Sequence, residues 1–143
     1  LGLSPRHQGA LIGVQRILGR TSVKVRALPL GAALAAAQQG RYDQALALLT
    51  KIVTDDPRND EAWYQRGVVQ RMKGEFEKAV EDFSQALAIA PQRAELYQAR
   101  AIVHFFLKDY DASWEDVRHC YKTGGAVDGK FIDMLKEASG RIE

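Results

Sequence analysis

The amino-acid sequence predicts an all-α protein, an α-solenoid in which helix–turn–helix units stack on one another. Two observations predict this fold. Residues 60–93 read as two amphipathic helices joined by a tight turn at Lys73-Gly74. The same pattern of small, aromatic and helix-ending residues returns about 34 residues earlier and later, a period that marks stacked helical repeats. We therefore expect three units, in residues 26–59, 60–93 and 94–127.

The central unit has small residues where its two helices are expected to cross. Gly67 and Ala79 allow the helix axes to approach to roughly 8–10 Å. Gly74 supplies the left-handed conformation that ends the first helix, and Pro91 cannot continue the second. The residues that carry the pattern are Trp63, Gly67, Gly74, Phe76, Ala79, Phe83, Ala86 and Pro91.

The two flanking units keep this pattern with several departures. Pro29 stands where the first unit should have an aromatic residue, and we expect it in the first turn of a helix, where proline is tolerated. The third unit has Lys108 for the turn glycine, Ser113 for the alanine and glycines 124–125 for the closing proline. The residues that do match are Gly40, Tyr42, Ala45, Leu49, Ile52 and Pro57, then Tyr97, Ala101, Tyr110, Val117 and Cys120.

This spacing resembles that of the tetratricopeptide repeat family, and the resemblance covers residues 26–127. It implies one antiparallel helix pair per unit, and a concave groove lined by the first helix of each pair. The helices are expected over residues 27–39, 42–54, 60–73, 76–89, 94–107 and 110–122. Arg66 and Arg100 fall at a usually apolar position, where their stems can cover apolar surface while their charged ends stay in water.

The two ends of the chain lie outside the three units. In residues 1–25 an amphipathic helix is expected over about 8–19, followed by a linker, and it is interpreted as a repeat remnant or a cap. In residues 128–143 a helix over about 129–139, with Asp128 as its N-cap, is expected to cover the open end of the array. Because the chain begins at Leu1, it can be a piece of a longer protein.

Charge is distributed unevenly along the chain. The net charge is only +2, yet residues 1–42 contain six lysines and arginines and no acidic residue. Three interpretations stay open for this segment: an ordered cap or repeat remnant, a contact with an anionic partner or membrane surface, and a targeting segment. There is no apolar run of 18 residues or more, so we expect no membrane span, and the compartment is left open.

No arrangement of residues indicates catalysis, a metal site or a cofactor. His119 and Cys120 are neighbours on a helix and point about 100° apart, so they cannot act as base and nucleophile, and Cys120 is expected to be an inert core thiol. His104 is expected to be a half-buried imidazole with its hydrogen bonds satisfied. Glu75, Glu77, Glu81 and Asp82 are expected to form a solvated helix face. No metal-ligand spacing or phosphate-binding loop is present.

Function is therefore expected to be binding. Carried onto this chain, the family's groove positions predict an apolar groove with one cation and with two acids, Glu61 and Glu95, at its rim. The predicted groove residues are Leu30, Leu34, Tyr64, Val68, Arg71, Gln98, Ile102 and Phe105. Tyr64 and Phe105 are the expected anchors, because aromatic side chains dominate interface energetics. The opposing interpretation is that Val68 and Ile102 are simply packed between neighbouring helices.

Chaperone adaptors of this family hold a peptide's C-terminal carboxylate with a lysine–asparagine set. That set is missing here, because the two key positions hold other residues: Leu30, Tyr64 and Gln98, and Leu34, Val68 and Ile102. We expect a non-catalytic scaffold that binds a partner peptide or amphipathic helix in the groove. The alternative is a self-assembling or membrane-peripheral module that uses the basic residues 1–26. Nucleic acid is disfavoured, because the basic charge lies at one end without interleaved aromatic residues.

Overall fold

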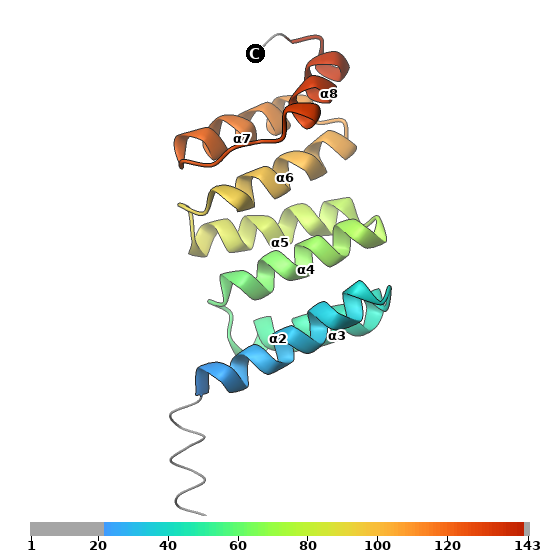
Figure 1. Cartoon of the computed structure of the whole chain (residues 1–143), viewed down its shortest axis with the longest axis vertical. Coiled ribbons are helices and arrows are strands. Elements are labelled where there is room, and N and C mark those ends of the chain that lie inside the picture. Colours follow the sequence, from blue (N-terminus) through green and yellow to red (C-terminus); the bar gives the residue numbers. More distant parts are fainter. Residues whose placement is uncertain (1–21, 142–143) are drawn as a thin grey trace, which may run out of the picture.

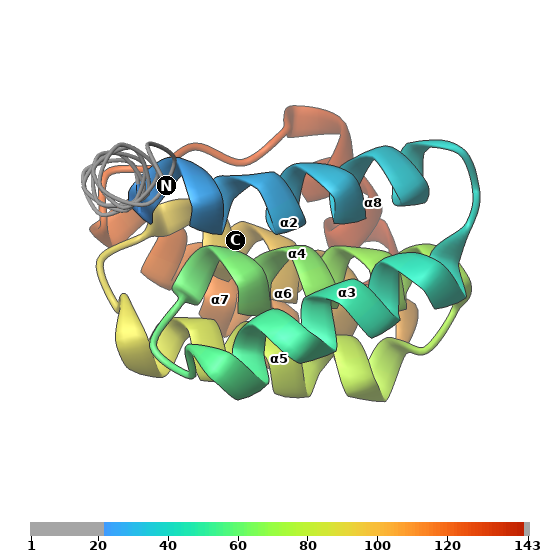
Figure 2. The same ribbon diagram turned by 90° about the horizontal axis from the view of Figure 1, so that it is seen from below.

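The computed structural model describes residues 22–141, which form seven helices and no strand (Figure 1). The helices are α2 (Ser22–Gln38), α3 (Tyr42–Asp55), α4 (Asp60–Lys73), α5 (Phe76–Ile89), α6 (Ala94–Phe106), α7 (Tyr110–Lys122) and α8 (Gly129–Ser139). α2 packs against α3, α4 against α5 and α6 against α7, and the pairs join through α3 with α4 and α5 with α6. The pairs therefore stack into one array, which Figure 2 shows from its α2 end.

The helix boundaries fall within one residue of the expected ones, except at the start of α2. α4 and α5 begin and end at the predicted residues. α2 begins at Ser22, so residues 22–25 are helical where a linker was expected, and Pro29 lies inside the helix rather than in its first turn. Proline inside a helix removes one backbone hydrogen bond and crowds the carbonyl four residues before it, yet α2 continues past Pro29 to Gln38. Leu30, directly after Pro29, is half-buried and packs against the core of the first unit, to which the buried Ala33 belongs.

The crossing of α4 and α5 is built on a size match between Gly67 and Phe83. A Cβ added to Gly67 would lie 2.6 Å from Cε1 of Phe83, so the ring occupies the space that any larger residue would need. In the first unit Ala33 shares a core with Leu49 at the same two positions. In these two units a smaller residue on one helix therefore faces a larger one on the other, so that each pair fills a similar space.

The third unit compensates for its serine at the crossing. The Ser113 hydroxyl is fully buried and donates a hydrogen bond to the carbonyl of Ala101 at 2.8 Å. The extra polar group is therefore satisfied inside the helix pair, which removes most of its burial cost.

The turn inside each unit uses a left-handed residue. Gly40 and Gly74 have φ of 77° and 87°, as their positions predict. Lys108 takes the same place in the third unit with φ of 63°, although it has a side chain. Asp109, the next residue, is the N-cap of α7, and its side chain accepts a hydrogen bond from the Ala112 amide.

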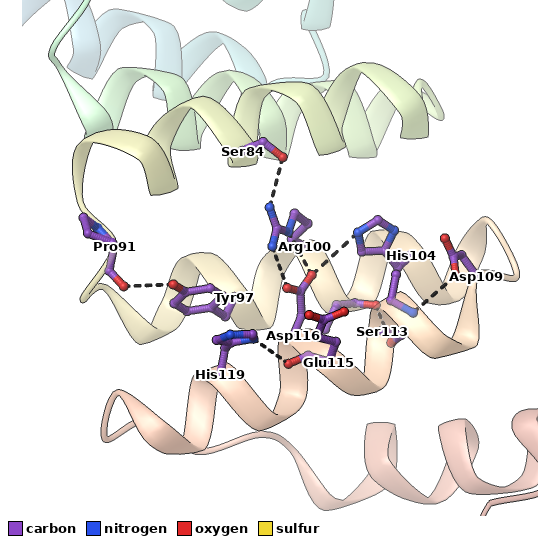
Figure 3. A network of polar contacts seen from close by, with 12 residues as sticks. Ser84, Pro91, Tyr97, Arg100, His104, Asp109, Ser113, Glu115, Asp116 and His119 are labelled. Atoms are coloured by element: carbon purple, nitrogen blue, oxygen red, sulfur yellow. Dashed lines mark hydrogen bonds and ion pairs between the residues drawn. The ribbon is translucent and has the colours of Figure 1, made fainter.

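An arginine in the first helix of the second and third units binds an aspartate in the second helix of the same unit. The Arg100 guanidinium donates to both carboxylate oxygens of Asp116, at 2.9 and 2.7 Å, and also to the Ser84 hydroxyl of the preceding unit at 3.1 Å (Figure 3). Arg66 binds Asp82 in the same way, at 3.0 and 2.7 Å. These arginine heads were expected in water and Asp82 on a solvated face; both expectations are wrong, because Asp82 is only 2% exposed.

Aromatic residues make a second connection between neighbouring units. Nε1 of Trp63 donates to the carbonyl of Pro57 at 2.9 Å, and the Tyr97 hydroxyl donates to the carbonyl of Pro91 at 3.0 Å. Each bond ties the start of one unit to the end of the previous one. The closing proline therefore offers a carbonyl acceptor as well as a helix break.

The C-terminal helix α8 covers the open end of the third unit, as expected. Asp128 is its N-cap, with a side-chain oxygen that accepts a hydrogen bond from the Lys130 amide at 3.1 Å. Leu135 is fully buried in a cluster with Ala101 and Trp114. Because α8 supplies these apolar contacts, the last repeat is not left with a bare apolar face.

Candidate functional site

A hollow lies between the first helices of the second and third units, α4 and α6. Its volume is about 200 Å³. The lining side chains are Tyr64, Val68, Arg71, Glu95, Gln98, Ala99 and Ile102. All except the exposed Glu95 are half-buried, so they present part of their surface outward while packing in the array. Tyr64 and Val68 also contact the core cluster around Phe83 and Val103.

Five of the eight predicted groove residues line this hollow, and three do not. Leu30 packs against the core of the first unit, and Leu34 is half-buried on α2. Phe105, expected as an anchor, lies edge-on to Phe131 of α8 with ring centroids 5.6 Å apart. The cap was expected from the sequence, but the residue that it covers was not. Ala99 is a lining residue that the repeat positions did not indicate.

Two polar side chains that line the hollow, Gln98 in its middle and Arg71 at one end, have no hydrogen-bond or ion-pair partner within the described part of the chain. Arg71 forms no ion pair there, and Gln98 forms no side-chain hydrogen bond. Their neighbours are Val68 and Ile102. A guanidinium beside apolar side chains interacts more strongly with an anion than one in bulk water does, because nearby apolar atoms lower the local dielectric constant.

The other end of the hollow is acidic. Arg93 binds Asp60 at 2.7 Å, Glu61 at 3.0 Å and also Glu95, so three carboxylates share one guanidinium. Its Cζ lies 5.5 Å from the centroid of the Tyr64 ring, which fixes that ring at the wall of the hollow. Sequence reasoning missed Arg93, although it lies about one repeat period after Asp60 and Glu61.

His104 is half-buried, as expected, but its hydrogen bonds are not all satisfied. Nε2 lies 3.6 Å from an oxygen of Asp116, while Nδ1 is buried without a hydrogen-bond partner in the described residues (Figure 3). Burial lowers the pKa of His104, and Asp116 opposes that shift. The repeat position alone could not show this, because the aspartate belongs to the next helix.

His119 and Cys120 do not form a reactive pair. The His119 ring stacks on Tyr97, and its Nδ1 lies 2.9 Å from the carbonyl of Glu115. Cys120 is buried, and that burial raises the pKa of its thiol. The thiolate that nucleophilic chemistry needs is therefore disfavoured. Gly125 packs close to this residue, since an added Cβ would lie 2.8 Å from its sulfur.

Some predictions concern residues that the structure does not describe, and others can be compared only with residues 22–141. Residues 1–21, which hold the expected first helix and half of the basic residues of 1–42, lie outside the described range. Across residues 22–141, no group of three or more His, Cys, Asp and Glu side chains is placed to hold a metal ion. In the same range, none of the helices has both the length and the apolar character that a bilayer crossing requires.

The stacked antiparallel helix pairs and the hollow between their first helices define a helical-repeat protein. Residues 30–94 match the family model of the tetratricopeptide repeat. Within these residues the chain belongs to the tetratricopeptide repeat family. A comparison with curated protein sequences gave no match.

Solved structures share this fold at low sequence identity. The first TPR of Spaghetti (RPAP3) bound to HSP90 peptide SRMEEVD has a TM-score of 0.72 at 20% identity, over 80% of this chain and 90% of that chain. The Sgt2 TPR domain from Aspergillus fumigatus has a TM-score of 0.72 at 20% identity, over 80% and 77%. The Arabidopsis OM64 TPR domain has a TM-score of 0.72 at 17% identity, over 83% and 98%.

Proposed function

We propose that this chain is a non-catalytic interaction module that binds a segment of another protein in the hollow between α4 and α6. One observation carries the proposal. Half-buried apolar side chains surround Arg71 and Gln98, two polar groups that have no partner within residues 22–141. Polar groups left unpaired among apolar ones are the usual composition of a recognition site.

The size of the hollow favours a protein segment over a small cofactor. Its volume of about 200 Å³ lies below the roughly 300–1,000 Å³ of small-molecule sites. A hollow of this size suits one or two side chains of a longer segment, which makes its remaining contacts along the α4 and α6 surfaces. Val68 and Ile102 would contact the apolar side chains of that segment.

Similar folds support a peptide as the ligand. Besides the first TPR of RPAP3 with its HSP90 peptide, the TPR2B domain of yeast Sti1 was solved as a complex with pHsp70, and it has a TM-score of 0.71 at 15% identity. The present chain lacks a lysine–asparagine set at the positions expected to hold a C-terminal carboxylate. We therefore propose that this chain contacts its peptide along the length of the peptide and does not require a free C-terminus.

The direct test compares two variants that add the same charge in different places. Val68→Glu puts a carboxylate in the hollow, whereas Ala88→Glu puts one on the exposed side of α5. Peptides selected from a displayed random library on the wild-type chain should bind Ala88→Glu normally and Val68→Glu at least about tenfold more weakly. Equal binding to both variants, with unchanged circular dichroism, would place the interaction elsewhere.

A second candidate function uses the basic start of the chain. Residues 1–42 carry six lysines and arginines without an acid, a composition that favours an anionic neighbour or membrane surface. Association through this segment should weaken strongly between low and physiological salt, because exposed charges are screened. Association that is insensitive to salt would rule this candidate out.

A further inference from the structure

The hollow between α4 and α6 has ends of opposite charge. At one end Arg71 makes no ion pair within the described residues. At the other end the carboxylates of Asp60, Glu61 and Glu95 outnumber their shared partner Arg93. Glu95 is 53% exposed on its side chain and lines the hollow itself, so this negative charge is accessible to a ligand.

The separation of the two ends sets a length for the ligand. Glu61 and Arg71 lie ten residues apart on the single helix α4, which corresponds to about 15 Å along the helix axis. An extended chain advances roughly 3.3 Å per residue, so four or five of its residues span that length. A helical ligand would need about ten residues to span it.

The free side chain of Gln98 distinguishes between these two conformations. An extended segment presents unpaired backbone N–H and C=O groups, whereas a helix satisfies its own. The Gln98 carboxamide lies in the wall between the two charged ends, and it can both donate to and accept from a peptide backbone. The hollow therefore suits an extended segment better than a helical one.

We infer that the ligand is an extended peptide segment with a carboxylate side chain over Arg71 and a cationic side chain, four or five residues away, over Glu61 and Glu95. Apolar residues between the two charges contact Val68 and Ile102. This inference rests on the proposed function of the hollow, and it adds the sequence pattern of the peptides that the hollow selects. The pattern does not include a free C-terminus, and a purely acidic peptide would be repelled at the Glu95 end.

The test is a selection from random decapeptides displayed on a phage coat protein, so that no peptide has a free C-terminus. Wild type should enrich sequences with one acidic and one basic residue four or five positions apart. Arg71→Glu should enrich sequences with a basic residue at both places. A wild-type-selected peptide, synthesised with an amidated end, should lose about tenfold in affinity for Arg71→Glu and regain it when its acidic residue is changed to lysine.

The possible outcomes distinguish a wrong charge pattern from a wrong binding site. Enriched peptides without the charge spacing, or with a spacing of about ten residues, would overturn the inference while leaving the hollow as a binding site. Equal affinity of the selected peptide for wild type and Arg71→Glu would do the same. If Val68→Glu enriches and binds the same peptides as wild type, the proposed function fails and the inference fails with it.

Discussion

The carboxylate of Asp82 accepts two hydrogen bonds from the Arg66 guanidinium although only 3% of its side chain is exposed. Burial raises the pKa of Asp82, and the arginine opposes that shift. Arg100 and Asp116 repeat the arrangement in the next unit. In the first unit the two places hold Ala32 and Leu48, so neither position carries a charge there.

Breaking the Arg66–Asp82 pair should therefore cost more than replacing it. Arg66→Ala leaves a buried carboxylate without its partner, and we expect a loss of roughly 3 kcal/mol in the free energy of unfolding. The double variant Arg66→Ala with Asp82→Leu copies the first unit and should recover more than half of that loss. Urea denaturation of wild type and the two variants measures this, and a double variant at least as unstable as the single one would contradict it.

Gly67→Ala should destabilise the domain although alanine is the better helix former. The added methyl group would meet the Phe83 ring at 2.6 Å, and overpacking of this kind costs roughly 1–3 kcal/mol, against about 1 kcal/mol gained in helix propensity. In a Phe83→Leu background, which copies Ala33 and Leu49 of the first unit, the same substitution should be neutral or stabilising. A double-mutant cycle measured by thermal unfolding gives the difference between the effects of Gly67→Ala on stability in the two backgrounds. Equal effects in both backgrounds would rule out the size match.

Lys108→Gly should stabilise the domain. The lysine holds a left-handed backbone with φ of 63°, which costs a residue with a Cβ about 1 kcal/mol, and glycine adopts it freely. The reciprocal change Gly74→Lys imposes that cost on the second unit and should lower stability by a similar amount. Chemical denaturation provides both values. A decrease in stability for Lys108→Gly would show that its side chain has a role that outweighs the strain.

Acid should destabilise the domain partly through His104. Its pKa in the folded state lies below the ordinary value of 6.5, so below about pH 6.5 the unfolded chain takes up a proton more readily than the folded one. Stability is therefore lost as pH falls through that range. His104→Phe should make the drop in unfolding free energy between pH 7.5 and 5.5 smaller than in wild type. An unchanged drop would assign the pH dependence to other groups.

Turn and capping residues predicted most of the helices, because these local signals lie inside each unit. Gly74 ends α4 with the backbone that its position requires, and Asn59 caps the start of α4 by accepting from the Ala62 amide. Burial of individual polar residues was harder to predict. Asp82 looks like part of an acidic helix surface until Arg66, 16 residues earlier, is placed beside it. The recurrence of both residues one unit later, as Arg100 and Asp116, is a signal in the sequence that indicates the pair.

The candidate site was predictable only in part, for a related reason. Tyr64, Val68 and Ile102 follow from the repeat position, because each unit presents the same face to the groove. Phe105 also occupies a groove position, but it packs against α8, which has no counterpart in the earlier units. Repeat position predicts where a side chain points within a unit, and it cannot predict what a segment outside the repeat covers.

The most direct test of the central claim is backbone amide NMR of the wild-type chain titrated with a selected, amidated peptide. We predict that the largest shift changes fall on Tyr64, Val68, Gln98 and Ile102, and that Arg71 and Glu95 respond with them. Ala88 on α5 and Met134 on α8 should stay unchanged. Changes centred on α8 or on the basic start of the chain, with the α4–α6 hollow unaffected, would contradict the account.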